Sequence, residues 1–235
     1  MVRRILAIFI KETQDIATNF NVSILFALPL IFAVIFKRLG NAMDAPAIAS
    51  TSVLLLAGMA GIYVPSMLVA EEREKRTLQV LMLSPATPAE VFIGKGLMTL
   101  VMTLLFALIT YILAGVPAAR IPVLLLFFAL GVAACIPLGM IVGLFAPNVL
   151  STGLVGMPLY LAFILLPPFT VFNETLKQVG RVLPTTHLYY VTIAEAGPGA
   201  RASWLLETAG ILLLMCAVAC LLLTWVYRRR ATALG

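Results

Sequence analysis

Apolar runs long enough to cross a lipid bilayer recur through this chain and constrain its fold more than any other feature. The hydrocarbon core of a bilayer is about 30 Å thick, and a helix of about 20 residues crosses it. Six such runs, the first of them short, are separated by polar or turn-forming segments. They cover residues 22–36, 47–70, 91–114, 122–145, 149–166 and 204–227. The fourth run contains Gly139-x-x-x-Gly143, which predicts a close-packing face, and the fifth stops at Pro167-Pro168. The pattern predicts an all-α polytopic membrane protein with six transmembrane helices.

The composition supports lipid as the solvent of this chain. Of its 235 residues, 62% are hydrophobic and only 11% are charged, whereas soluble domains carry about 25% charged residues. A chain of this size cannot hide that much apolar surface in one core. The net charge of +6 comes from basic residues near the ends of the apolar runs, as expected at membrane edges. We therefore expect membrane lipid, and no nucleic acid, among its partners.

The first 20 residues predict a helix that lies along the membrane surface. Ile5 and Phe9 belong to its apolar side, and Arg3, Lys11 and neighbouring polar residues to its wet side. Such segregation is typical of interfacial amphipathic helices. Residues 1–20 are therefore interpreted as an interfacial helix that precedes the first span.

Residues 169–201 differ from the spans because they are moderately polar and interrupted. We expect two short helices here, at 174–183 and 186–195, which lie at the outer interface or re-enter the membrane. His187, the only histidine of the chain, lies in this region. It has no catalytic partner in the sequence, and we interpret it as a hydrogen-bonded interfacial residue.

The orientation follows from the distribution of lysine and arginine between the two sides of six spans. One side collects Arg3, Arg4, Lys11, Arg73, Lys75, Arg76, Lys95, Arg228, Arg229 and Arg230. The other side collects Lys37, Arg38, Arg120, Lys177, Arg181 and Arg201. The excess on the first side predicts that both termini and the loop between the second and third spans are cytoplasmic.

That cytoplasmic loop, residues 71–90, is the longest polar interruption of the chain. We expect a helix to leave the membrane and continue to residue 83, where Ser84-Pro85 ends it. Thr87-Pro88-Ala89-Glu90 then has the pattern of a capping box at the start of a new helix. The loop is thus predicted to be a rigid helix–turn–helix element.

The same loop resembles that of ABC transporter permeases of the type-2 exporter family. The family pattern is roughly E-x-E-x-G-T-L-E-x-L-x-x-S-P, with G-K about ten residues later. The matching residues are Glu71-Glu72-Arg73-Glu74, Arg76-Thr77-Leu78, Leu81, Ser84-Pro85 and Gly94-Lys95. Arg76 stands where the family often has Gly, and Gln79 where it often has Glu. The predicted topology of the whole chain is similar to that of the family.

The resemblance implies that this chain docks a separate ABC ATPase subunit, which would bind ATP and Mg²⁺. The loop would be a coupling helix region, with the N-terminal helix beside it as a connecting helix. The implied docking residues are Glu71, Glu72, Glu74, Arg76, Leu78 and Leu81. The resemblance also implies a prokaryotic plasma (inner) membrane location.

Six spans form a narrow bundle, so we expect pairing with a second copy or a homologous permease. The resemblance implies a substrate path along the seam of that dimer, lined by the second and fifth spans. The candidate residues are Ser52, Met59, Tyr63, Ser66, Met157, Tyr160 and Phe163. A path without fixed charge would suit a hydrophobic or amphipathic substrate, drug-like or lipid-like.

We expect no catalytic, cofactor or metal site on the chain itself. Gly94-Lys95 lacks the upstream glycine of a phosphate-binding loop. No acidic residue lies near the centre of a predicted span, which argues against an ion-coupled carrier. An ion-coupled secondary carrier, and a non-transporting membrane scaffold or sensor that binds a cytoplasmic partner, remain the alternatives to an ATP-driven exporter.

Overall fold

The computed structural model describes residues 2–39, 43–75 and 87–232, and within these ranges the chain forms helices and no strands. In chain order the elements are α1 (Val2–Thr18), α2 (Phe20–Arg38), α3 (Ala45–Gly58), the π-helical turn η1 (Met59–Tyr63), α4 (Val64–Glu74), α6 (Pro88–Ala114), the short η2 (Ala118–Arg120), α7 (Ile121–Phe145), α8 (Ser151–Phe169), α9 (Glu174–Gly180), α10 (Pro184–Ala196) and α11 (Ala202–Thr232).

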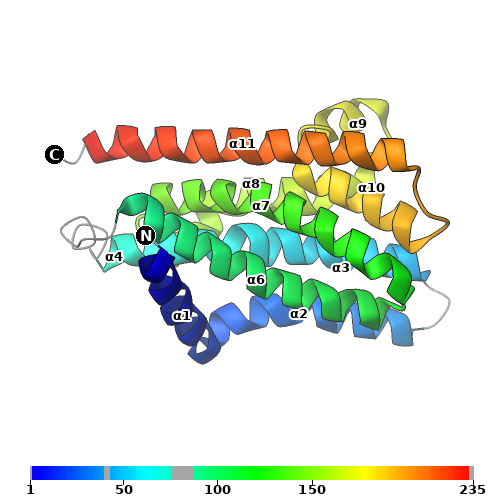
Figure 1. Ribbon diagram of the computed structural model, residues 1–235, viewed down its shortest axis with the longest axis horizontal. Coiled ribbons are helices and arrows are strands. Elements are labelled where there is room, and N and C mark those ends of the chain that lie inside the picture. The colour runs from blue at the N-terminus through cyan, green and yellow to red at the C-terminus, as the bar shows by residue number, and fades with distance from the viewer. Residues whose placement is uncertain (1, 40–42, 76–86, 233–235) are drawn as a thin grey trace.

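The long helices lie side by side along one axis, and α1 crosses them obliquely at one end (Figure 1). That end, called here the α1 end, also gathers the end of α4, the start of α6 and the C-terminal end of α11. The opposite end, called the α10 end, holds α9, α10 and the start of α11. The all-helical bundle predicted from the sequence is thus confirmed.

Five helical segments in the described residues are long and apolar enough to cross a membrane. They are Ala45–Glu74, Ala89–Ala114, Ala118–Phe145, Ser151–Phe169 and Ala202–Arg230. They correspond to the second to sixth predicted spans. The first predicted span lies in α2, which is not among the five. The count of six spans therefore stays a prediction.

The second predicted span is one continuous helix of 30 residues, built from α3, η1 and α4. Asp44 caps its start by accepting a hydrogen bond from the backbone N–H of Ala47. In η1 the N–H of Val64 reaches back to the carbonyl of Met59, a wider turn than in an α-helix. Pro65, which has no N–H to donate, follows this turn. Most side chains of this helix are buried, so it forms the centre of the bundle.

Gly139 and Gly143 allow α7 to approach this central helix closely. A Cβ atom on Gly139 would overlap the backbone of Ile62, and one on Gly143 would overlap the backbone of Ser66. The absence of side chains at these two positions brings the helix backbones together. The close-packing role that their four-residue spacing predicts is confirmed.

Two helix ends differ from the sequence prediction. The fifth predicted span was expected to stop before Pro167-Pro168, but α8 continues through both prolines to Phe169. The hydroxyl of Thr170 then donates to the carbonyl of Pro167 at the end of the helix. The helix that leaves the second span was expected to reach residue 83, but α4 ends at Glu74, with Lys75 as its cap. Residues 76–86 lie outside the described part.

The two short helices expected between residues 169 and 201 are confirmed as α9 and α10. Asn173 caps α9 through its side chain, and Pro184 opens α10, where a missing N–H costs nothing. α10 is largely buried and packs against α3, α7 and α8. Its position relative to a membrane surface, interfacial or re-entrant, stays a prediction.

Candidate functional site

The start of α6 is fixed by the predicted capping box. The backbone N–H of Thr87 donates to the carboxylate of Glu90 over 2.7 Å, and the N–H of Glu90 donates to the hydroxyl of Thr87 over 3.3 Å. Arg4 of α1 lies 3.7 Å from the same carboxylate. The capping box is confirmed, and it also contacts the N-terminal helix.

One turn further into α6, Lys95 joins three helices through buried charges. Its ammonium lies 2.7 Å from the carboxylate of Glu12 on α1 and 3.1 Å from that of Glu72 on α4. The side chains of Lys95, Glu12 and Glu72 are only 4%, 3% and 12% exposed. We call these three residues the α1-end triad. Because each charge has an opposite partner in a place that water scarcely reaches, the triad holds α1, α4 and α6 together.

Two neighbours complete the surroundings of the triad. Gly94 allows α1 to lie against α6, since a Cβ atom there would overlap the side chain of Ile8. Lys11 lies on the solvent side, 3.3 Å from Glu12 and 3.9 Å from Glu72. Partial burial works against its charge, but the nearby carboxylates outweigh this effect and raise the pKa of Lys11.

The structure places the acidic residues of the predicted docking surface in different environments. Glu72 points inward to the triad, whereas Glu71 pairs with Lys75 at the surface and raises its pKa through a hydrogen bond. The exposed Glu74 accepts a hydrogen bond over 3.0 Å from the N–H of Val149, in the turn between α7 and α8. The other docking candidates, Arg76, Leu78 and Leu81, lie outside the described residues. The docking role stays a prediction.

Three of the predicted path residues come together between the central helix and α8. The hydroxyls of Ser66 and Tyr160 share a hydrogen bond of 2.8 Å, and the ring of Tyr63 stands edge-on to that of Tyr160, with centroids 5.1 Å apart. Each hydroxyl also has a backbone carbonyl within reach: the carbonyl of Thr152 lies 3.2 Å from the Tyr160 hydroxyl, and that of Tyr63 lies 2.6 Å from the Ser66 hydroxyl. Because each hydroxyl has one proton, the one that donates in the shared bond does not donate to its carbonyl. The second and fifth predicted spans are therefore neighbours, and Tyr160 links them.

The other four path candidates do not join this polar cluster. Phe163 is buried beside Ile62 in a small apolar core. Ser52 is buried, and its hydroxyl has no hydrogen-bond partner within the described part of the chain. Met59 is half-buried and Met157 is exposed. Whether any of these residues contacts a substrate stays a prediction.

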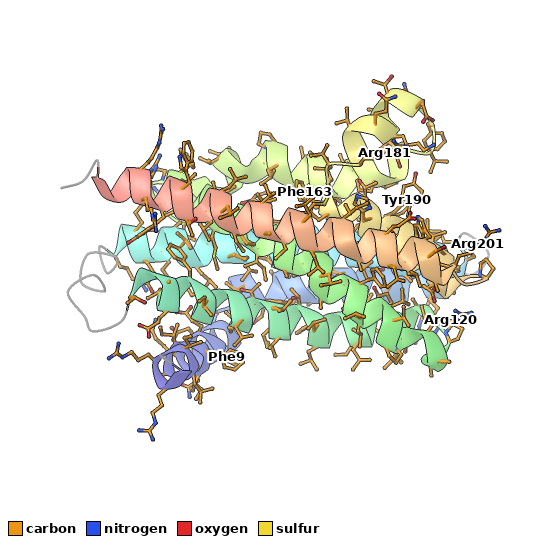
Figure 2. All side chains as sticks on the ribbon, turned by 45° about the horizontal axis from the view of Figure 1, so that its top comes forward. Phe9, Arg120, Phe163, Arg181, Tyr190 and Arg201 are labelled. Atoms are coloured by element: carbon orange, nitrogen blue, oxygen red, sulfur yellow. The ribbon has the colours of Figure 1, made fainter. Side chains whose placement is uncertain are left out.

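At the α10 end, Arg120 of η2 lies 3.0 Å from the buried carboxylate of Glu195 on α10. The second oxygen of Glu195 accepts a hydrogen bond from the N–H of Ala200. Gly199 has the left-handed φ of 94°, and a Cβ atom there would overlap the Arg120 guanidinium. Figure 2 shows Arg120 and Arg201 at this end and Phe9 of α1 at the other. His187 is hydrogen-bonded, as expected, with its Nε2 atom 3.0 Å from the carbonyl of Arg181.

Sequence reasoning missed the α1-end triad and the Arg120–Glu195 pair. Glu12 is one of the polar residues that the sequence predicts on the wet side of the N-terminal helix. Lys95 enters the sequence analysis only through the Gly94-Lys95 motif and the count of basic residues on the cytoplasmic side. The one local signal was that motif itself, since a glycine beside a lysine at a helix start permits close approach of another element. Among the described residues, no group of three or more His, Cys, Asp or Glu side chains is arranged to hold a metal ion.

The comparisons with known proteins agree with this architecture. A family model described as ABC-2 family transporter protein matches residues 8–226, nearly the whole chain. No curated protein sequence matches the chain.

Proposed function

Because the chain belongs to the ABC-2 family of transporter proteins, we propose that it exports a hydrophobic or amphipathic substrate and that the α1-end triad transmits the driving motion. Membership makes it a multi-pass membrane protein and the permease subunit of an ABC transporter, whose ATPase is a separate subunit. The export direction, the substrate class and pairing with a second copy or a homologous permease belong to the proposal. The proposal also includes binding of ATP and Mg²⁺ by the partner ATPase, a location in the prokaryotic inner membrane, and cytoplasmic termini.

The observation that carries the proposal is the burial of Lys95 between Glu12 and Glu72. An ATPase that docks on residues 71–90 would push on the end of α4 and the start of α6. The triad connects both ends to α1, and separating its charges would leave at least one of them buried and unpaired. The three helix ends would therefore move together when the partner closes, as a rigid-body transition requires.

The central helix would carry this motion toward the substrate path. α4 continues through η1 into α3 without a break, and Gly139 and Gly143 hold this helix against α7. On its other side, the Ser66–Tyr160 hydrogen bond connects it to α8. A movement of α4 relative to α8 would open this contact and offer two hydroxyls and the Tyr63 ring to a substrate. Such a surface suits a molecule with both apolar and polar parts.

The docking part of the proposal is tested by charge reversal at the exposed acidic residues of the loop. The double variant Glu71→Lys/Glu74→Lys is co-expressed with the partner ATPase and purified through the permease. We expect the ATPase to be lost from the complex and its substrate-stimulated ATP hydrolysis to disappear. Glu72 is left unchanged because its reversal would break the triad and confuse a docking defect with a folding defect.

The matched control is Glu174→Lys, a charge reversal of an exposed glutamate at the α10 end. It should leave co-purification and ATP hydrolysis at the parent level. Full ATPase recovery with Glu71→Lys/Glu74→Lys would show that the loop is not the docking surface. Transport in proteoliposomes that stops on addition of an uncoupler, with ATP held constant, would instead identify an ion-coupled carrier. An ATPase complex without substrate flux would identify a scaffold or sensor.

A further inference from the structure

Two arginines from helices far apart in the sequence converge on the C-terminal end of α7. Arg73 of α4 donates through Nη1 to the carbonyls of Leu144 and Ala146, each over 3.0 Å. Arg230 of α11 donates through Nη1 to the same Leu144 carbonyl over 2.7 Å. The last carbonyls of a helix have no partner within the helix. They therefore hold both guanidinium groups close together at the α1 end.

Within the described residues, no acidic side chain balances the positive charge of Arg73 and Arg230. All ten aspartate and glutamate side chains of the sequence lie in the described residues, and none of them forms an ion pair with Arg73 or Arg230. Each guanidinium has five N–H donors, and the hydrogen bonds to α7 use only one nitrogen of each. Two guanidinium groups that meet at one carbonyl and have further N–H donors favour binding of an anion.

The aromatic and apolar side chains around Arg73 and Arg230 favour an anion that is attached to an apolar group. The Arg230 guanidinium lies 4.1 Å above the ring of Phe145, and that of Arg229 lies 4.3 Å above the ring of Trp225. These rings are 48% and 53% exposed, as expected of aromatic residues at the level of lipid headgroups. Along α11, the side chains nearer the middle of the helix are exposed and apolar, among them Leu221 and Val218. The acyl chains of a bound lipid would pack against this apolar face of α11, further toward the middle of the helix than the charged groups.

We propose that Arg73, Arg229 and Arg230, with Phe145 and Trp225, bind the phosphodiester headgroup of an anionic phospholipid. We call these five residues the α7-end lipid site. The occupied site would bridge α4, α7 and α11 with a molecule from the membrane, in the way that basic pockets between membrane helices bind acidic headgroups. The proposal requires only that the chain lies in a membrane. It stands independently of the substrate, the partner and the transport direction.

The experiment uses the two tryptophans of the chain as reporters at opposite ends. Trp204→Phe leaves only Trp225, which lies in the site, and Trp225→Phe leaves only Trp204, at the start of α11. The full chain is placed in phosphatidylcholine vesicles that contain brominated phosphatidylglycerol or brominated phosphatidylcholine. We expect quenching of Trp225 to show a preference of about fivefold for the anionic lipid, which corresponds to one favourable arginine contact. Trp204 should show no preference.

Arg230→Gln in the Trp204→Phe background should abolish this preference, while the glutamine side chain keeps an N–H for the Leu144 carbonyl. The control Arg201→Gln removes an exposed arginine at the α10 end and should leave the preference unchanged. Equal quenching of Trp225 by the two lipids, or an unchanged preference with Arg230→Gln, would overturn the proposal. So would loss of the preference in millimolar inorganic phosphate but not in chloride of equal ionic strength, because the site would then bind a free anion.

Discussion

The two ends of the bundle both contain buried charges, but they bury them differently. At the α1 end, Lys95 and both of its carboxylate partners are shielded from solvent. At the α10 end, Glu195 is buried, whereas its partner Arg120 is 41% exposed. Charges screened by water interact weakly, while a buried charge that loses its partner is strongly destabilising. The α1 end is therefore a charge-locked junction, and the α10 end is a contact that water can partly replace.

The two contacts also differ in what they join. The α1-end triad connects α1, α4 and α6, whose charged residues lie as far as 83 positions apart in the sequence. The pair at the α10 end connects η2 to the end of α10, and Glu195 also holds the turn before α11 through Ala200. A junction between helix ends can transmit a push from a partner, whereas a contact that orders a turn chiefly maintains local structure. We therefore expect only the α1 end to combine stability with coupling.

The largest effect is expected from Lys95→Met. This variant leaves Glu12 and Glu72 buried beside each other with only the exposed Lys11 as a nearby cation. Breaking a buried ion pair in this way costs about 3–5 kcal/mol. The free energy of unfolding should fall by about that amount when the purified chain is unfolded by denaturant in detergent micelles. Substrate-stimulated ATP hydrolysis by the complex should fall as well.

A triple variant distinguishes lost charge balance from lost packing. Glu12→Gln/Glu72→Gln/Lys95→Met removes all three charges and should recover much of the stability, because a neutral arrangement carries no unpaired buried ion. It should not recover coupling if the ion pairs transmit the motion. Parent-like unfolding of Lys95→Met would contradict the view of the α1 end as a charge-locked junction.

An intermediate effect is expected from Glu195→Ala at the α10 end. This variant leaves the N–H of Ala200 without its acceptor and Arg120 without its carboxylate, and the loss should be about 1–3 kcal/mol because water can reach the arginine. Glu195→Gln should lose less, since its amide oxygen still accepts from Ala200. Both variants should keep the parent ratio of substrate-stimulated to basal ATP hydrolysis. A coupling loss as large as that of Lys95→Met would remove the distinction between the two ends.

Local sequence patterns predicted those parts of the structure that depend on short spacings. The Thr87–Glu90 capping box and the Gly139–Gly143 packing face follow from three- and four-residue separations along one helix. Tyr63, Ser66 and Tyr160 meet between the second and fifth spans, but their role in a substrate path stays a prediction.

The remaining features depend on how distant helices pack. The sequence does not show which residues of α1 and α6 face each other. Glu12 is therefore predicted to be exposed, and only the structure places it beside Lys95. Glu72 belongs to an acidic string that resembles a docking motif, yet the position of α4 turns it inward. The Pro167-Pro168 pair predicts a helix end, whereas α8 contains both prolines and continues to Phe169.

The smallest effect concerns Lys11, on the solvent side of the α1-end triad. Its side chain is 61% exposed, so its pairs with Glu12 and Glu72 should contribute less than about 1 kcal/mol. Because the folded-state pKa of Lys11 is raised, its contribution is complete below the unfolded-state pKa of about 10.4 and is lost as the pH rises through the folded-state value. The difference in unfolding free energy between the parent and Lys11→Met should stay constant from neutral pH to about pH 10 and then shrink. A difference that grows with pH would show that Lys11 does not act on the triad through its charge.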